Sequence, residues 1–371
     1  MRGSLAPSRD RGAALSVEVD QSSAEGLVFH TSAGQDLITA LLGSWMTIGG
    51  FVDGFAHRNL DTPETFFTPW HGVLYTGYLA SSIWVVWLVA RNRDRAPSPV
   101  GAIPVGYGVT VAGLAVFAAG GIGDLIWHTL LGIEVSIDAL LSPTHIMLLL
   151  GAILIVAGPL RARWWDDGYQ PDRLAAFLPP LVAVTAATAE VGFFFQYVDG
   201  LSSRFMQATY EPGPESGYFE VVAGLSSMLI TTVILMGALL LLMRRWRLPP
   251  GSALFLFGAF GLLMELLEGY EFPEDVIAPI AAGLSAEMVL RYLYRGSGNL
   301  AAIRITAFIV PLVMWGVRFG VFERYADINW PVSVWTGSLV FTGLTAVGLS
   351  LLAFPPTRDG DNRLGSAASD R

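Results

Sequence analysis

Apolar segments of about 20 residues recur along the 371-residue chain, separated by short polar stretches. A helix of about 20 apolar residues spans the roughly 30 Å hydrocarbon core of a bilayer. The pattern therefore predicts an all-α fold, a polytopic bundle of transmembrane helices. We expect ten helices, over residues 35–57, 69–91, 103–128, 140–160, 175–198, 218–243, 252–270, 275–295, 302–322 and 331–354.

The basic residues divide unequally between the two sides that this helix count defines. All 22 are arginines, and 18 of them fall on the side that holds both chain ends. Short cytoplasmic loops carry such an excess of positive charge. The asymmetry predicts a multi-pass protein of the cell (inner) membrane with both termini in the cytoplasm. The four arginines outside the pattern are Arg58, Arg204, Arg318 and Arg324.

Composition agrees with a membrane protein and excludes some chemistry. Only 14% of the residues are charged and 53% are hydrophobic, whereas soluble domains have about 25% charged residues. The chain has no cysteine, which excludes disulfides, thiolate metal ligands and a cysteine nucleophile. We expect a flexible cytoplasmic segment over 1–34, a transmembrane domain over 35–355 and a cytoplasmic tail over 356–371.

Two stretches of the chain share one pattern of glycine, aspartate, proline and histidine. They are "GGFVDGFAHRNLDTPETFFTPWHGVLYTG" (49–77) and "GGIGDLIWHTLLGIEVSIDALLSPTHIMLLLG" (120–151). Both contain Gly-Gly-x-x-Asp-x3-His, a short connection, and then [Asp/Glu]-x3-[Ser/Thr]-Pro-x-His-x5-Gly. Four of the five histidines lie in this repeat. The matched side chains are Asp53, His57 and His71 in the first copy and Asp124, His128 and His145 in the second.

The spacing brings each set of three side chains to one place. Asp and His at i and i+4 share a helix face, and [Ser/Thr]-Pro-x-His is typical of a helix start with an N-cap and proline at the first helical position. A short outer loop then places two imidazoles and a carboxylate together, which predicts a metal site with an open coordination position. A hydrogen-bonded network without metal and a proton relay are the alternatives. Glu64 and Asp138, in the connections, are candidates for orienting the imidazoles.

The other helices also pair into hairpins, which predicts five tandem two-helix units. The metal-bearing units cover 35–91 and 103–160, and degenerate copies cover 175–354. Glu190 and Glu265 lie near the depth of the repeat's aspartates but lack a histidine at i+4. A carboxylate within a membrane usually marks a function, so both are candidate catalytic residues.

The second copy resembles the metal motif of the C subunit of copper membrane monooxygenases, the particulate methane and ammonia monooxygenases. That subunit carries Asp-x2-Trp-His and then Thr-Pro-Ser-His-Ile, and this chain has Asp124-Leu-Ile-Trp-His128 and then Ser-Pro-Thr-His145-Ile. The resemblance covers about 30 residues per copy. It implies that Asp124, His128 and His145 bind copper near a site of oxygen activation and, by internal homology, that Asp53, His57 and His71 do so too. The family has one copy of the motif where this chain has two.

The resemblance implies a copper-dependent, monooxygenase-like oxidoreductase acting on an apolar substrate that enters from the lipid. Its electrons would come from a quinol or a partner protein. Iron and zinc fit the same ligands, and zinc would make the protein an intramembrane lipid hydrolase with Glu190 or Glu265 as general base. Metal transport, sensing or storage is a third reading. The sequence leaves open whether the two sets of ligands form one dinuclear centre, and which oligomer forms. Nothing in it indicates nucleic-acid binding.

Overall fold

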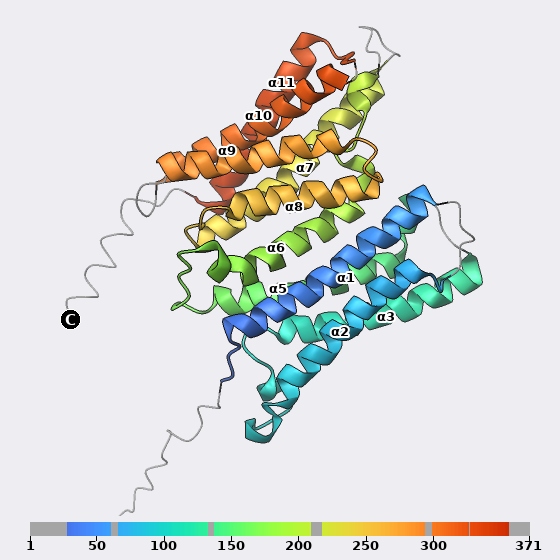
Figure 1. The fold of residues 1–371 in the computed structure, drawn as a ribbon, viewed down its shortest axis with the longest axis vertical. Coiled ribbons are helices and arrows are strands. Elements are labelled where there is room, and N and C mark those ends of the chain that lie inside the picture. Colours follow the sequence, from blue (N-terminus) through green and yellow to red (C-terminus); the bar gives the residue numbers. More distant parts are fainter. Residues whose placement is uncertain are drawn as a thin grey trace, which may run out of the picture.

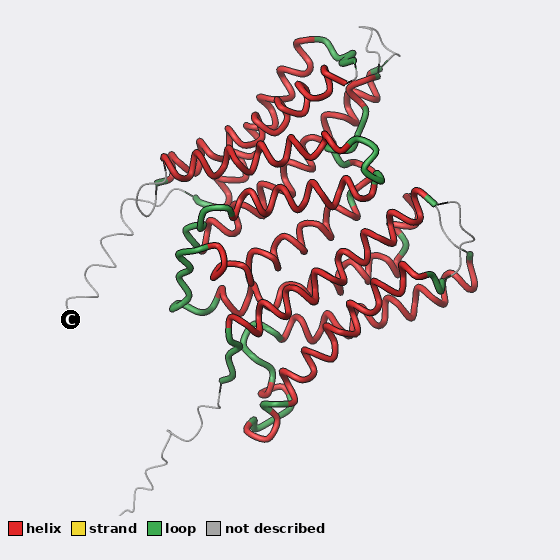
Figure 2. The backbone as a smooth tube through the Cα atoms, viewed as in Figure 1, coloured by secondary structure: helices red, strands yellow, loops and turns green. Residues whose placement is uncertain are grey.

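The computed structural model describes residues 28–60, 66–132, 137–208, 217–293, 299–325 and 327–355. Within these ranges every regular element is helical, which confirms the predicted fold class (Figure 2). Short 3-10 turns join several helices. The α-helices are α1 (Ala33–Asn59), α2 (Pro69–Ala90), α3 (Gly108–Leu131), α4 (Ile137–Leu141), α5 (Pro143–Trp164), α6 (Leu174–Phe194), α7 (Tyr218–Arg245), α8 (Ser252–Leu267), α9 (Ile277–Leu293), α10 (Leu300–Tyr325) and α11 (Val332–Ala353).

Each of the ten predicted helices is present. In the described ranges, nine helices are long and apolar enough to cross a membrane, so the chain is a multi-pass membrane protein. The tenth, α8, has only 16 residues and spans about 24 Å. Gly251 precedes it with φ +92°, and Gly269 (φ +69°) and Tyr270 (φ +56°) follow it. These left-handed residues end the helix on both sides, so the prediction that it continues to residue 270 was wrong.

The start of α3 also differs from the prediction. The helix begins at Gly108, five residues after the predicted start at 103. Gly106 has φ +88°, and a Cβ there would lie 2.4 Å from the backbone nitrogen of Ala162. Because only glycine fits this left-handed position against α5, residues 103–107 form a turn.

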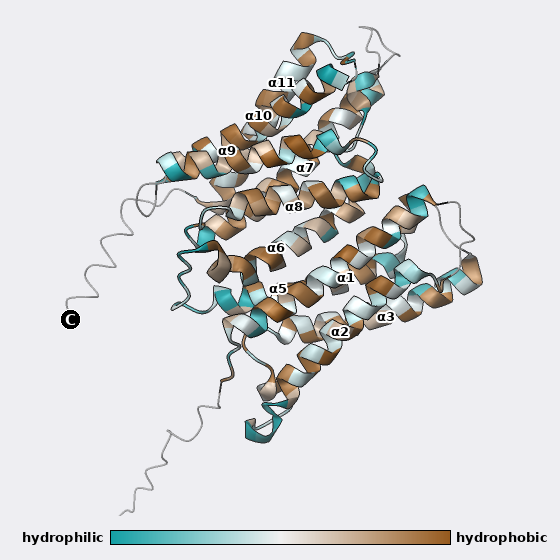
Figure 3. Cartoon of the chain, viewed as in Figure 1, coloured by the Kyte–Doolittle hydropathy of each residue, from teal (hydrophilic) through white to brown (hydrophobic). Residues whose placement is uncertain are grey.

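The helices lie side by side in a layered bundle (Figure 1). α1 is central and packs against α2, α5, α6 and α8, while α3 packs on α5. α9, α10 and α11 form the edge of the bundle that lies opposite α2 and α3, and α10 packs against both α9 and α11. The start of α1 and the end of α11 lie at the same end of the bundle (left in Figure 1). Brown apolar residues dominate the middle of the helices, and teal polar residues gather near their ends (Figure 3).

Glycines of the repeat close both metal-motif hairpins in the same way. A Cβ on Gly77 of α2 would lie 2.6 Å from the backbone nitrogen of Met46, and a Cβ on Gly151 of α5 would lie 2.6 Å from that of Phe117. Met46 and Phe117 stand seven residues before the repeat's aspartates. The α1–α2 and α3–α5 pairs therefore cross backbone to backbone at equivalent positions. Two further equivalent contacts join Gly49 to Leu74 and Gly120 to Leu148.

Four arginines do not lie on the side that holds both chain ends. Three of them form ion pairs at the opposite end of the bundle. Arg58 lies 2.9 Å from Glu268, and Arg204 lies 2.7 Å from Asp275. Arg318, fully buried in α10, binds the same Asp275. Buried guanidinium groups are rare unless paired. These arginines therefore depart from the sequence pattern because each forms an ion pair with the segment that follows α8.

Candidate metal centre

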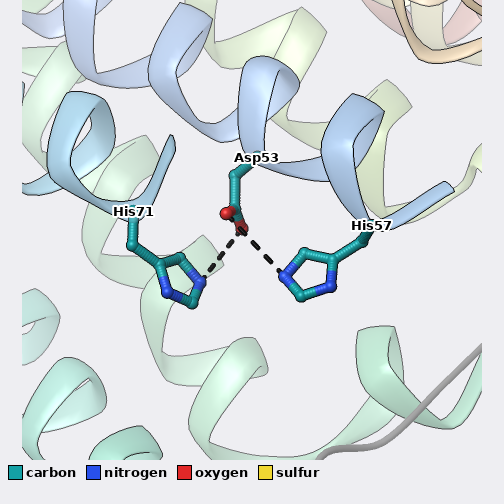
Figure 4. A group of neighbouring side chains, drawn as sticks. All are labelled: Asp53, His57 and His71. Carbon is teal, nitrogen blue, oxygen red and sulfur yellow. Dashed lines mark ion pairs between the residues drawn. The ribbon is translucent and has the colours of Figure 1, made fainter. Parts of the chain in front are cut away.

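The first triad, Asp53, His57 and His71, forms where α1 ends and α2 begins. Asp53 and His57 lie one turn apart on α1. The Thr68 hydroxyl caps α2 by accepting a hydrogen bond from the His71 backbone nitrogen at 3.1 Å, and Pro69 is the first helical residue. This is the predicted helix start. It holds the His71 ring beside Asp53, between α1 and α2 (Figure 4).

The separations within the first triad suit a single ion. Asp53 Oδ2 lies 3.2 Å from His71 Nε2, and Asp53 Oδ1 lies 3.8 Å from His57 Nε2. Two ligands that are each about 2.1 Å from one tetrahedral ion lie about 3.4 Å apart. In Figure 4 both rings turn a nitrogen toward the carboxylate that lies between them.

The backbone fixes the protonation of the His71 ring. Its Nδ1 lies 2.5 Å from the carbonyl oxygen of Phe66, and a carbonyl only accepts hydrogen bonds. The Nδ1 atom must therefore carry the proton, and Nε2 points at Asp53 either with a lone pair or with a second proton. A carbonyl that orients the far nitrogen in this way is typical of a metal-binding histidine.

The Asp53 carboxylate is incompletely paired. Its Oδ1 atom is buried and has no hydrogen-bond partner in the described structure. A buried charged oxygen without a donor costs free energy. A cation held between the carboxylate and the imidazoles would remove that cost.

The second triad, Asp124, His128 and His145, brings the matching residues together between α3 and α5. Ser142 caps α5, and its hydroxyl lies 2.7 Å from His145 Nδ1. Asp124 Oδ2 lies 3.3 Å from His128 Nε2, and Asp124 Oδ1 lies 3.5 Å from His145 Nδ1. As in the first triad, the ligand atoms lie within 4.8 Å of one another. The structure thus brings together all six predicted metal ligands, in two groups of three.

Hydrogen bonds hold the second triad more completely than the first. Thr144 donates to Asp124 Oδ1 at 3.0 Å. His128 Nδ1 lies 3.3 Å from the carbonyl oxygen of Gly132, so Nδ1 carries a proton. Its Nε2 faces the carboxylate, as in His71. Sequence reasoning missed Thr144, whose signal was its position between the motif's proline and histidine.

Both triads line one cavity of about 710 Å³. Phe66 lies between them, its ring centroid 5.3 Å from that of His71 and 6.4 Å from that of His128. The two histidine rings are therefore no more than about 12 Å apart. Tyr75 also lines the cavity, with its ring 6.3 Å from His71. The triads are two separate ligand groups that share one chamber, and sequence spacing gave no sign of this.

The cavity extends from the triads into the bundle. Its walls include Thr47, six residues before Asp53 on α1, and Ala152, seven residues after His145 on α5. At 1.5 Å per residue the cavity reaches about 10 Å along these helices. Glu190 of α6 lines it as well, whereas Glu265 does not. The Glu265 carboxylate accepts a hydrogen bond from the Phe272 backbone nitrogen at 3.1 Å and so orders the loop after α8.

Asp199 and Glu268 are two of the acidic groups of the cavity wall that lie beyond the helix ends. Burial raises the pKa of Glu268, and the Arg58 guanidinium partly offsets this. Burial also raises the pKa of Asp199, although Ser202 and Thr231 donate hydrogen bonds to its carboxylate. Both carboxylates have protein partners, which suits a structural role.

The side chains of the two connection carboxylates lie outside the described part of the structure. Glu64 lies outside the described residues, and Asp138 lies in α4 with its side chain outside them. Their proposed part in orienting the imidazoles stays a prediction.

Comparison of the chain with protein-family models, curated proteins and solved structures finds no match. The two triads and the cavity that they share are therefore the features that indicate a function.

Proposed function

We propose that this membrane protein is a metalloprotein that holds one copper ion in each triad. We further propose that it oxidises an apolar substrate in the shared cavity. The triads would lie near the outer face of the cell membrane and the arginine-rich loops in the cytoplasm, because positive charge gathers on the cytoplasmic side.

The fixed imidazoles are the observation that carries the metal proposal. In each triad one histidine has its Nδ1 proton directed at a backbone carbonyl and its Nε2 directed at an aspartate, His71 in the first and His128 in the second. A neutral imidazole in this position would direct a lone pair at the carboxylate, which is unfavourable unless a proton or a cation lies between them. A metal ion turns that unfavourable contact into shared coordination.

Copper is proposed from the motif resemblance, because imidazole and carboxylate ligands suit several metals. Bound copper would supply one-electron chemistry and oxygen activation. The chain's own residues would hold the metal, and the apolar walls would keep water from the substrate. A quinol or a partner protein would supply electrons. A chamber of about 710 Å³ beside the ligands favours chemistry on a substrate over metal transport or storage.

Zinc hydrolysis is the second candidate. The observation that favours it is that Glu190 lines the same cavity as both triads, where a carboxylate serves as general base for a metal-bound water in zinc hydrolases. This activity would need neither oxygen nor a reductant.

Elemental analysis of protein purified without chelators separates these candidates. We expect two copper ions per chain, and one in each of the variants His71→Ala and His128→Ala. His30, exposed and ahead of α1, is the only histidine outside the triads, so His30→Ala should keep both ions. Oxygen consumption with a quinol as reductant should then require both triads.

The outcomes are distinct. Zinc lost from the triad variants, with no oxygen consumption, would favour the hydrolase. Wild-type protein without metal, even after incubation with each ion, would contradict the metalloprotein proposal.

A further inference from the structure

Glu190 differs from the other carboxylates of the cavity wall. It is 9% exposed, and no charged group of the described chain lies close enough to act on it. Its polar neighbour is the Thr47 hydroxyl of α1, and within the described residues Thr47 Oγ1 forms no hydrogen bond of ordinary geometry. Among the described residues, Glu190 therefore lines the cavity with a neutral hydroxyl as its polar neighbour and with no charged partner.

Asp199 and Glu268, two other carboxylates of the cavity wall, both have partners within the protein. Asp199 accepts hydrogen bonds from Ser202 and Thr231, and Glu268 pairs with Arg58. A carboxyl group inside a membrane bundle is costly unless something pairs with it. We expect the missing partner of Glu190 to be a molecule in the cavity.

The walls around Glu190 are apolar. Phe193, one turn later on α6, packs against Phe51 with ring centroids 5.2 Å apart. Phe51, Phe117 and Leu148 line the same chamber, which has the volume of a typical small-molecule site. An occupant of this part must be largely apolar.

We propose that the deep part of the cavity binds an apolar molecule bearing one hydroxyl group, an alcohol or a phenol, which hydrogen-bonds to Glu190. A hydroxyl donates to a carboxylate and also accepts from a carboxylic acid, so it pairs with Glu190 in either protonation state. This names the substrate class of the proposed function and rests on it for the view that substrate occupies the cavity. Binding of the hydroxyl itself does not depend on which metal the triads hold.

The specificity should be large. A site built to pair a hydroxyl rejects the analogue that lacks it, because the buried polar group is then left alone. We expect a preference of about tenfold or more for the hydroxyl compound over a methyl analogue of the same shape.

The test is equilibrium binding of 1-naphthol and 1-methylnaphthalene to the metal-loaded protein in nanodiscs, corrected for partition into protein-free nanodiscs. The wild-type protein should prefer 1-naphthol about tenfold or more. Glu190→Leu should lose that preference and keep its affinity for 1-methylnaphthalene, and Glu190→Gln should keep part of the preference, since an amide also pairs with a hydroxyl. Glu220→Leu, at an exposed carboxylate of α7, should behave as the wild type.

Metal content of each sample separates this inference from the proposed function. Equal affinities for the two probes in the wild-type protein, or an unchanged preference in both Glu190 variants, would overturn the inference even when two metal ions are bound. A wild-type protein that binds no metal but discriminates between the probes would overturn the proposed function and leave the hydroxyl site standing.

Discussion

The two triads come from one repeat, yet they are built to different degrees. The Asp124 side chain is 2% exposed and accepts a hydrogen bond from Thr144. The Asp53 side chain is 16% exposed, and its Oδ1 has no hydrogen-bond partner among the described residues. The hydrogen bond depends on one position, because Trp70 stands in the first copy where Thr144 stands in the second.

This comparison shows how a repeated motif can yield unequal sites. The helix crossings, the caps and the ligand types are equivalent in both hairpins, and the groups that orient the carboxylate are not. Hydrogen bonds to a ligating carboxylate fix its direction and raise metal affinity. We therefore expect the second triad to bind its ion more tightly than the first.

Loss of a whole site is the largest expected effect. Asp53→Asn and Asp124→Asn each remove the charge that holds two imidazoles to one ion, so each should lower the metal content from two ions per chain to one. The two variants also isolate the sites, since each leaves one triad intact. Loss of both ions in either single variant would show that the triads form one interdependent centre.

Removing the Thr144 hydroxyl should weaken the second site alone. In the Asp53→Asn background, Thr144→Val should lower metal affinity by about 10- to 100-fold, as measured by competition with a chelator. Thr129→Val is the matched control, because the Thr129 hydroxyl donates a hydrogen bond to the Leu125 carbonyl of its own helix. Equal affinities in the two variants would remove the physical basis of the comparison.

The glycine crossings should prove equivalent. An alanine at Gly77 or Gly151 places a methyl group against the backbone of the facing helix, which should destabilise the protein by about 1–3 kcal/mol in each case. Thermal unfolding in detergent measures this, with Gly237→Ala as control because no atom of the described residues lies within 4 Å of a Cβ there. A large effect at one glycine only would mean that the two hairpins are not packed alike.

The smallest expected effect is a gain. In the Asp124→Asn background, Trp70→Thr supplies a hydroxyl where Asp53 Oδ1 lacks a donor and should raise the metal affinity of the first site by about three- to tenfold. Trp70→Phe removes the indole without supplying a donor and should give no gain. A similar gain in metal affinity in both variants would show that the gain comes from loss of the tryptophan and not from the added hydroxyl.

The sequence predicted much of this molecule because the signals were local. Helix length and hydropathy predicted the ten helices, and the Asp-x3-His and Ser/Thr-Pro-x-His spacings predicted the two groups of Asp and His side chains, since both depend on residues within one or two turns. The early end of α8 was not predicted because Tyr270 adopts a left-handed conformation, which is uncommon for a residue other than glycine. The five-unit division of the chain stays a prediction.

The shared cavity could not be predicted, because it depends on how the hairpins pack on one another. Contacts of α1 with α5 and α6 bring the first triad, the second triad and Glu190 to one chamber, and no sequence spacing encodes those contacts. The buried pairing of Arg318 with Asp275 is likewise a contact between distant segments. Tertiary packing decides both.

The most direct test of the central claim is the number of metal ions bound per chain. It should be measured in the wild-type protein and in the double variant Asp53→Asn/Asp124→Asn, both purified without chelators. We predict two ions in the wild type and none in the double variant. Metal retained by the double variant, or none in the wild-type protein after reconstitution, would contradict the assignment of the triads as metal sites.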